Sequence, residues 1–140
     1  MSTEAIRVAL VAAVESAKLG FNDGYALKVQ YDNLFSIDTK TQELPYLKVE
    51  IDVLDGYQKN LSSRPMQKLS GTLVMAAVVK AGSGMSKANK LRDYFAAQLM
   101  RKNFDGVRTH MSTYTRAYEL DGWLYNPVVI PFWADKNPLG

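Results

Sequence analysis

The sequence predicts an α+β domain in which a single antiparallel or mixed β-sheet carries two helices packed on one face. Three observations support this fold class. Residues 45–53 alternate apolar and polar side chains without a fault. A longer apolar strand pattern over 69–80 runs through a short glycine loop into an amphipathic helix pattern. Near the end, two strand-like segments meet at Asp121-Gly122, a pair typical of tight hairpin turns. At 140 residues, the chain (1–140) fits one such domain with its own core.

The first element expected is a helix that Ser2 or Thr3 can cap and that Gly20 ends in the left-handed conformation. Its apolar stripe is rich in alanine and consists of Ile6, Leu10, Ala13, Val14 and Ala17. Such a small face packs closely against a sheet or against another subunit.

A turn at 22–24 precedes a predicted strand over Leu27 to Tyr31, and an irregular stretch over 32–44 follows it. The segment after Pro45 is the clearest strand. Its apolar side chains should face the core, and these are Leu47, Val49, Ile51 and Val53. Its other side should face water or a partner, and it carries Tyr46, Lys48, Glu50 and Asp52.

Residues 54–68 are polar and of mixed charge, and we interpret them as a long hairpin connection. Loops of this length in compact domains tend to be functional or disordered. The hypothesis for this loop is that it reaches out of the domain to hold another protein. Its candidate interaction residues are Asp55, Gln58, Lys59, Arg64 and Lys68.

The next strand, 69–80, becomes apolar on both sides toward its end, which predicts burial on both faces there. After the glycine loop 81–84, Ser83 or Ser86 is expected to cap a helix that runs to about Lys102. The helix stripe should consist of Ala88, Leu91, Phe95 and Leu99, and residues 103–106 should form the helix exit.

The final hairpin is expected to pair 113–120 with 123–133. Pro127 and Pro131 cannot donate to a ladder, so the last strand should lie at an edge or carry a bulge. Aromatic side chains crowd this hairpin beside Arg116, as they do at protein interfaces and at base-stacking surfaces. They also suit the core face of the sheet. The rings are Tyr114, Tyr118, Trp123, Tyr125, Phe132 and Trp133.

The sequence contains few of the residue combinations that catalysis requires. The chain has no cysteine and a single histidine, His110, which excludes Cys/His dyads and multi-histidine metal clusters. No serine nucleophile elbow is present. The carboxylate pairs 50/52 and 119/121 lack a third group to orient them. The glycine loop has neither a third glycine nor a Gly-Lys-Ser/Thr motif. We expect no enzyme, cofactor or metal site.

Net charge and hydropathy give little support to a nucleic acid or a membrane as the partner. The net charge of +3 is mild and spread along the chain, which argues only weakly for nucleic acid. The N-terminal run is too polar to span a bilayer and lacks a basic leader, so no membrane partner is expected.

A set of short motifs, in this order and spacing, resembles the tail terminator proteins of long-tailed (siphovirus-type) bacteriophages. The resemblance extends over residues 1–102 and more loosely over 123–135. The motifs are Thr3-Glu-Ala-Ile6, Asp32-Asn33 with Phe35, Pro45-Tyr-Leu-Lys-Val49, Gly71-Thr-Leu73 and Gly82-Ser-Gly84. The segment 107–118 matches none of them.

The resemblance implies a structural virion protein without catalysis. Tail terminators form a hexameric ring on the end of the tail tube, stop tube polymerisation and present a surface for head joining. The implied partners are further copies of the chain, the tail tube protein and a head-tail connector protein, with DNA only passing through the lumen. The implied location is the tail or neck of a virion assembled in the host cytoplasm.

Residues at the aromatic hairpin are the second group of candidate contacts, namely Tyr114, Arg116, Tyr118 and Glu119. Two other functions stay open. One is another neck or tail-tube ring protein; a tube protein would polymerise indefinitely, whereas a terminator stops at one ring. The other is a small nucleic-acid-binding module using the basic helix face and the aromatic hairpin, for which steep salt dependence of binding would be the signature.

Overall fold

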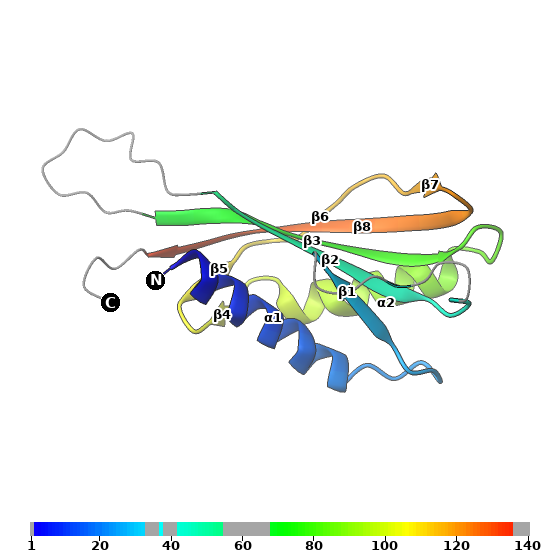
Figure 1. The fold of residues 1–140 in the computed structure, drawn as a ribbon, viewed down its shortest axis with the longest axis horizontal. Helices are drawn as coiled ribbons and strands as arrows, with labels where there is room; N and C mark the ends of the chain where they lie inside the picture. Colours follow the sequence, from blue (N-terminus) through cyan, green and yellow to red (C-terminus); the bar gives the residue numbers. More distant parts are fainter. Residues whose placement is uncertain (1, 33–36, 38–41, 55–67, 136–140) are drawn as a thin grey trace, which may run out of the picture.

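A computed structural model describes residues 2–32, 37, 42–54 and 68–135. It confirms an α+β fold with two helices and one mixed, curled sheet (Figure 1). The elements are α1 (Thr3–Leu19), β1 (Lys28–Tyr31), β2 (Tyr46–Leu54), β3 (Lys68–Lys80), α2 (Ser86–Leu99), β4 (Asn103–Phe104), β5 (Val107–Thr109), β6 (Thr113–Tyr114), β7 (Tyr118–Leu120) and β8 (Trp123–Asp135).

The strand order is β1-β2-β3-β8-β5-β4, with β6 and β7 also paired to β8. The β1–β2 pair is parallel, whereas all other pairs are antiparallel. β3 and β8, each of 13 residues, form the long central pair of the sheet. Both helices lie on the same side of this sheet (Figure 1).

α1 has the predicted start and stripe but a different end. The Ser2 side chain caps it by accepting a hydrogen bond from the Ala5 N–H at 3.0 Å. Gly20 has a φ of −88°, so the predicted left-handed end is wrong. The Gly20 N–H instead reaches back to the Ala17 carbonyl at 3.1 Å, and the Tyr94 hydroxyl donates to the same oxygen. These bonds satisfy the helix end without a left-handed residue.

α2 has the predicted buried stripe, but both of its predicted ends are wrong. The helix ends at Leu99 instead of running to about Lys102, because Met100 is already extended (φ −76°, ψ 148°) and Arg101 follows with a left-handed φ of 55°. At the start, Met85 occupies the cap position and no side chain caps it. The Ser83 hydroxyl donates to the Lys80 carbonyl at 2.6 Å and therefore stabilises the turn, while Ser86 already lies within the helix.

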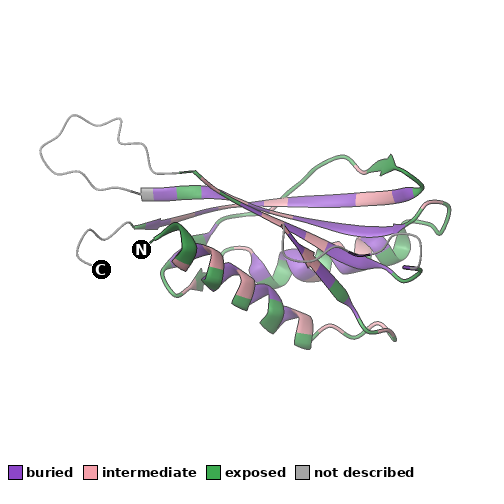
Figure 2. Ribbon diagram, viewed as in Figure 1, coloured by how far each residue is buried: buried purple, intermediate pink, exposed green. Residues whose placement is uncertain are grey.

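The main core fills the layer between the helices and the sheet (Figure 2). The predicted inward residues of β2 and α2 contribute to it, with Val53 only half-buried. A smaller cluster lies on the opposite face, where Tyr46 and Trp123 meet edge to face beside Ala76 and Val78. This cluster confirms that one end of β3 is buried on both faces. It also buries Tyr46, which shares a face with Lys48 but is only 2% exposed.

β8 lies inside the sheet, which corrects the expectation that its prolines place it at an edge. The carbonyls of Pro127 and Pro131 accept from the N–H groups of Thr115 and His110, on the side away from β3. In an antiparallel strand, the N and O of one residue point to the same neighbour. Each proline nitrogen therefore faces the side where β5, β6 and β7 are interrupted, and the β3–β8 ladder loses no donor.

The hairpin β4–β5 was not predicted, and the final hairpin is more broken than expected. Asp105 and Gly106, both with positive φ, turn β4 into β5 where only a helix exit was foreseen. The turn at Asp121-Gly122 is confirmed, with φ values of 52° and 83° that a primed turn requires. Its first arm, however, divides into the short strands β6 and β7.

Candidate interaction surfaces

The predicted loop contacts fall almost entirely outside the described residues. Asp55, Gln58, Lys59 and Arg64 are among residues 55–67, whose structure is not described. Lys68 is the first residue of β3, in register with Asp135 of β8. The hypothesis that this loop holds another protein stays a prediction.

The second predicted group lies on one continuous segment, residues 113–120, which we call the arm. The arm contains β6 and β7 and runs along β8 (Figure 1). All four predicted residues in it are exposed, with Tyr114 and Tyr118 each half accessible to solvent. Leu120, at 53% exposure, adds an apolar side chain at the end of the arm. The structure therefore brings these residues together, though not onto one face.

Tyr114 faces the helix side of the sheet, where Arg92 of α2 holds it. The Arg92 guanidinium carbon lies 4.2 Å from the centre of the Tyr114 ring. The same guanidinium donates to the Asn126 side-chain oxygen at 2.9 Å, and the Asn126 amide donates to Asn89 at 2.8 Å. Asn126 is only 1% exposed, so this chain of contacts satisfies a buried polar side chain. We call these four residues the arm latch.

Sequence reasoning missed Arg92. It follows Leu91 directly and precedes the exposed Asp93, with which it also pairs at 3.0 Å. A signal was present, because Arg92 lies four residues after Ala88 and three before Phe95. Both of these residues belong to the buried stripe, so Arg92 borders it.

Tyr118 faces the opposite side of the sheet and stacks on Tyr125. Their ring centres are 5.0 Å apart and the planes differ by 4°. The Lys48 ammonium lies 5.8 Å from the Tyr125 ring centre and pairs with Glu50 at 3.5 Å. The polar side chains of β2 thus continue into the arm across one open face of the sheet.

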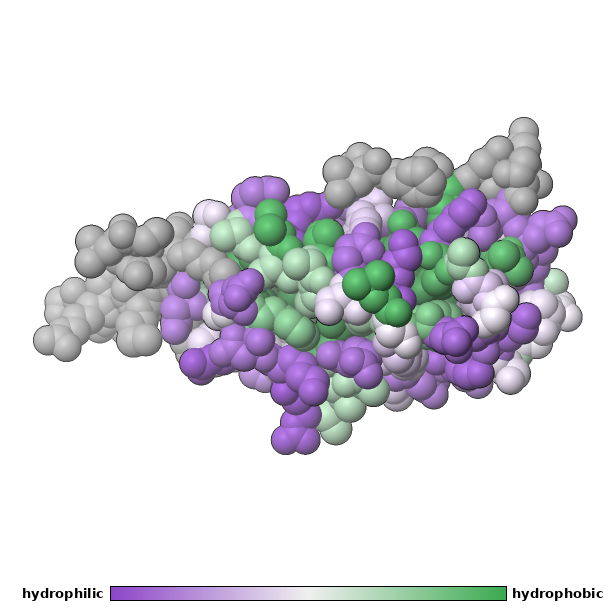
Figure 3. Space-filling view, turned by 90° about the horizontal axis from the view of Figure 1, so that it is seen from below, coloured by the Kyte–Doolittle hydropathy of each residue, from purple (hydrophilic) through white to green (hydrophobic). Residues whose placement is uncertain are grey.

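The helix side carries a separate apolar surface. Figure 3 shows the molecule from below, with hydrophobic side chains gathered between hydrophilic ones. α1 contributes Val8 at 59% and Leu19 at 89% exposure, on the flank opposite its buried stripe. The sequence prediction that this helix packs closely holds for its alanine-rich face, while the other flank stays open to solvent.

The described residues contain neither a membrane-spanning helix nor a metal-binding cluster. No described helix combines the length and apolar character that crossing a membrane demands. Within the same residues, no three histidine or carboxylate side chains gather as metal ligands would.

Buried phenols are the strongly perturbed titratable groups of the described chain. Burial, aided by Asp23, raises the pKa of Tyr25 to about 12. Burial also raises the pKa of Tyr31, with Glu15 adding to it, and that of Tyr46, with Tyr125 adding to it. Burial thus favours the neutral form of these groups, and none of them lies in the arm.

Comparisons with known proteins identify the fold. No family model and no curated protein matches the sequence. A solved structure described without any function matches with a TM-score of 0.71 and 16% identity, over 99% of both chains. Another, from the virion of a native gene transfer agent particle, matches with a TM-score of 0.60 and 17% identity. That match covers 94% of this chain and 98% of the other. At such identities, the likeness shows that the chain shares its whole fold with these proteins.

Proposed function

We propose that this chain is a structural protein of a phage or phage-like virion. The observation that carries the proposal is the match over nearly the full length of both chains to a protein of a gene transfer agent virion. The agreement concerns the fold of nearly the whole of both chains. A structural role without catalysis is the simplest reading of such a likeness.

Within the virion, we propose the role of tail terminator. The order of short motifs in the sequence supports this finer assignment, in which a hexameric ring caps the tail tube and offers a surface to the head-tail connector. Features of the subunit suit ring formation. The sheet has two short edge strands, β1 and β4, the arm exposes aromatic and charged residues, and α1 exposes apolar side chains.

The contacts proposed for this role are those predicted from the sequence. Tyr114, Arg116, Tyr118 and Glu119 of the arm would lie at a boundary between subunits. The loop over 55–67 would hold the tail tube or a neighbouring subunit. Another neck or tail-tube ring protein is the alternative, since the same fold match would suit it.

A tube-capping assay tests the terminator role. Purified protein is added to the tube protein encoded with it during polymerisation, and tube lengths are measured by negative-stain electron microscopy. A terminator should shorten the tubes in proportion to its concentration and appear as one ring at one end. A variant lacking residues 58–64 should remain folded by circular dichroism but leave tube length unchanged.

Two results would contradict the assignment. Indefinite polymerisation of this protein alone would identify a tube protein, and wild-type protein that leaves tube length unchanged would exclude capping. Capping that survives the deletion would retain the terminator role but remove the loop from it.

A further inference from the structure

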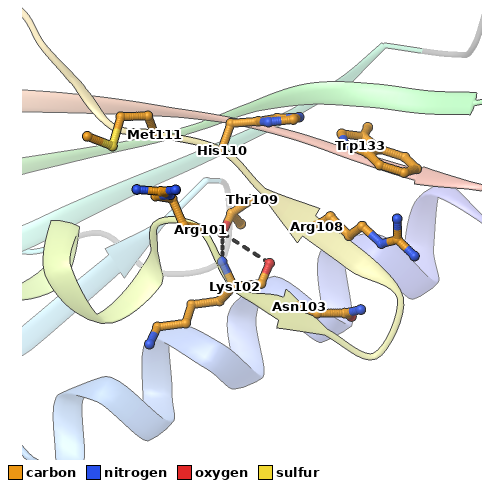
Figure 4. Close-up of a pocket in the computed structure, with 8 residues that line it drawn as sticks. All are labelled: Arg101, Lys102, Asn103, Arg108, Thr109, His110, Met111 and Trp133. Carbon is orange, nitrogen blue, oxygen red and sulfur yellow. Dashed lines mark hydrogen bonds between the residues drawn. The ribbon is translucent and has the colours of Figure 1, made fainter.

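A cleft lined by cationic side chains lies where α2 leads into β4 and β5, away from the arm. Its volume is about 760 Å³, and it is open to solvent (Figure 4). Eight residues line it, and none of them is acidic: Arg101, Lys102, Asn103, Arg108, Thr109, His110, Met111 and Trp133. We call it the basic cleft.

Thr109 builds the cleft by fixing the chain that leaves α2. Its hydroxyl donates to the Leu99 carbonyl and accepts from the Lys102 N–H at 2.9 Å. Its backbone N–H donates to the Lys102 carbonyl at 2.9 Å (Figure 4 draws the contacts with Lys102). Thr109 is only 6% exposed, so these bonds form in a buried setting. They hold the two cationic residues after the helix against β5.

Arg101 occupies a backbone conformation that favours glycine. Its φ is 55°, at the helix end where glycine is the usual residue, and its N–H donates to the His110 carbonyl. An arginine here places a guanidinium beside the cleft at some cost in backbone strain. Strained residues of this kind cluster at functional sites.

Arg108 and Trp133 form the other side of the cleft. They are in register across β5 and β8, and the guanidinium carbon lies 4.8 Å from the indole centre. His110 also packs on the indole, with ring centres 6.4 Å apart and planes inclined by 29°. The indole of the cleft thus already packs against a cation and an imidazole. The cleft therefore suits a ligand held by charge better than one held by stacking on the indole.

The cations of the cleft have their charge available. Arg101, Lys102 and Arg108 are all exposed, and none of the ion pairs among the described residues includes them. Figure 4 shows Arg101 and Arg108 on either side of Thr109, with Lys102 directed elsewhere. Charges spread in this way suit an extended polyanion better than a single small anion.

We propose that the basic cleft binds the phosphate backbone of nucleic acid, without reading its sequence. Exposed, long cationic side chains match the repeated charge of a duplex. An acidic peptide is the less suitable polyanion, because acidic motifs are commonly held by clustered arginines. The two arginines of the cleft instead lie on either side of Thr109 (Figure 4). The cleft shares Trp133 with the aromatic hairpin that the sequence offered for nucleic acid, but its cations lie after α2 and on β5. It does not depend on the terminator role.

Fluorescence anisotropy with a labelled DNA duplex of about 20 base pairs tests the proposal. Binding should weaken steeply as salt rises from about 50 to about 200 mM. A variant with R101G, K102A and R108A should bind at least about tenfold more weakly at about 100 mM salt. The slope of its log affinity against log salt concentration should be shallower than that of wild type by roughly 2.7, which is about 0.9 for each of three phosphate contacts.

The matched control removes three lysines elsewhere, in the variant K18A, K80A, K87A. This control loses the same net charge and should bind within about twofold of wild type with an unchanged slope. R101G alone should have a thermal midpoint equal to or above that of wild type, since glycine relieves the strain, while its affinity falls.

Three outcomes would overturn the proposal. In the first, the wild-type protein does not bind DNA at low salt. In the second, the two triple variants lose affinity equally, which would assign binding to net charge alone. In the third, polyglutamate of matched charge would bind more tightly than the duplex and lose that advantage in the cleft variant, which would assign the cleft to an acidic protein segment.

Discussion

At the scale of single residues, Gly71 is the glycine among those described that has the least room for a side chain. A Cβ built there would lie 2.8 Å from the Phe132 ring and closer still to the Asp52 carbonyl of the neighbouring strand. The backbone oxygen cannot move aside without disturbing the β2–β3 ladder. We predict that Gly71→Ala lowers the free energy of unfolding by about 3 kcal/mol. Urea denaturation measures it, with Ser70→Ala on the exposed neighbour expected within about 0.5 kcal/mol of wild type. A loss below about 1 kcal/mol for Gly71→Ala would contradict the packing described.

Tyr25 predicts how stability depends on alkaline pH. Its hydroxyl is buried without a hydrogen-bond partner in the described residues, and burial raises its pKa from the ordinary value of 10.0 to about 12. The folded state favours the neutral phenol. The contribution of this preference to the free energy of unfolding is therefore fully present below pH 10.0 and is lost as the pH rises through about 12. Tyr25→Phe should therefore retain stability at neutral pH and unfold at higher pH than wild type. Alkaline titration followed by circular dichroism measures this, with Tyr114→Phe as the exposed control. An unchanged alkaline midpoint in Tyr25→Phe would contradict it.

At the scale of elements, the arm depends on α2 through Arg92. Removing this side chain leaves the buried Asn126 oxygen without its donor and frees one face of Tyr114. We predict that Arg92→Ala lowers the free energy of unfolding by about 2 kcal/mol. Amide hydrogen exchange should quicken at residues 113–115 but not in β2. The control is Lys90→Ala on the same helix, which removes only the ion pair that the exposed Lys90 forms with Asp23. It should change stability by less than about 1 kcal/mol. Equal effects of the two substitutions would show that the latch does not hold the arm.

Elements with a long periodic pattern were predictable from the sequence, and short ones were not. The alternation in β2 and the stripes of α1 and α2 are signals repeated over several turns or residue pairs. β4 and β5 have two and three residues, too few for any period to appear. The proline rule misplaced β8 because a sequence does not reveal which neighbour each backbone N–H faces. The parallel β1–β2 pairing likewise depends on contacts that no local pattern encodes.

The candidate sites follow the same division. The exposed arm residues were predictable because aromatic and charged side chains beside a hairpin turn indicate contact surfaces. The basic cleft was not, since it joins Arg101 and Lys102 after a helix to Arg108 and Trp133 on two different strands. Only the β4–β5 hairpin, itself unforeseen, brings these residues together.

At the scale of the whole molecule, exposed contact surfaces lie on more than one side of the sheet. The arm exposes residues on both faces, and α1 exposes apolar side chains on the helix side. A subunit that contacts two neighbours through different surfaces closes into a ring when the rotation between copies allows it. Because the proposed tail terminator role implies a hexamer, we expect the purified protein to form a closed ring whose mass is about six times the 15.6 kDa of one chain. Light scattering over a range of concentrations, with negative-stain images, measures this.

Charge reversal in the arm tests which surface closes the ring. Arg116→Glu or Glu119→Lys should place like charges at the subunit boundary and shift the mass toward one chain at low concentration. Lys87→Glu, a matched reversal on the exposed side of α2, should leave the ring intact. Each variant should keep the wild-type thermal midpoint, because these side chains are exposed and contribute little to the fold of one subunit. An unchanged mass in both arm variants would place the subunit boundary elsewhere. The apolar flank of α1 would then be the next surface to test, by replacing its exposed Val8 and Leu19 with charged residues. A wild-type protein that stays monomeric at every concentration would contradict ring formation by the protein alone.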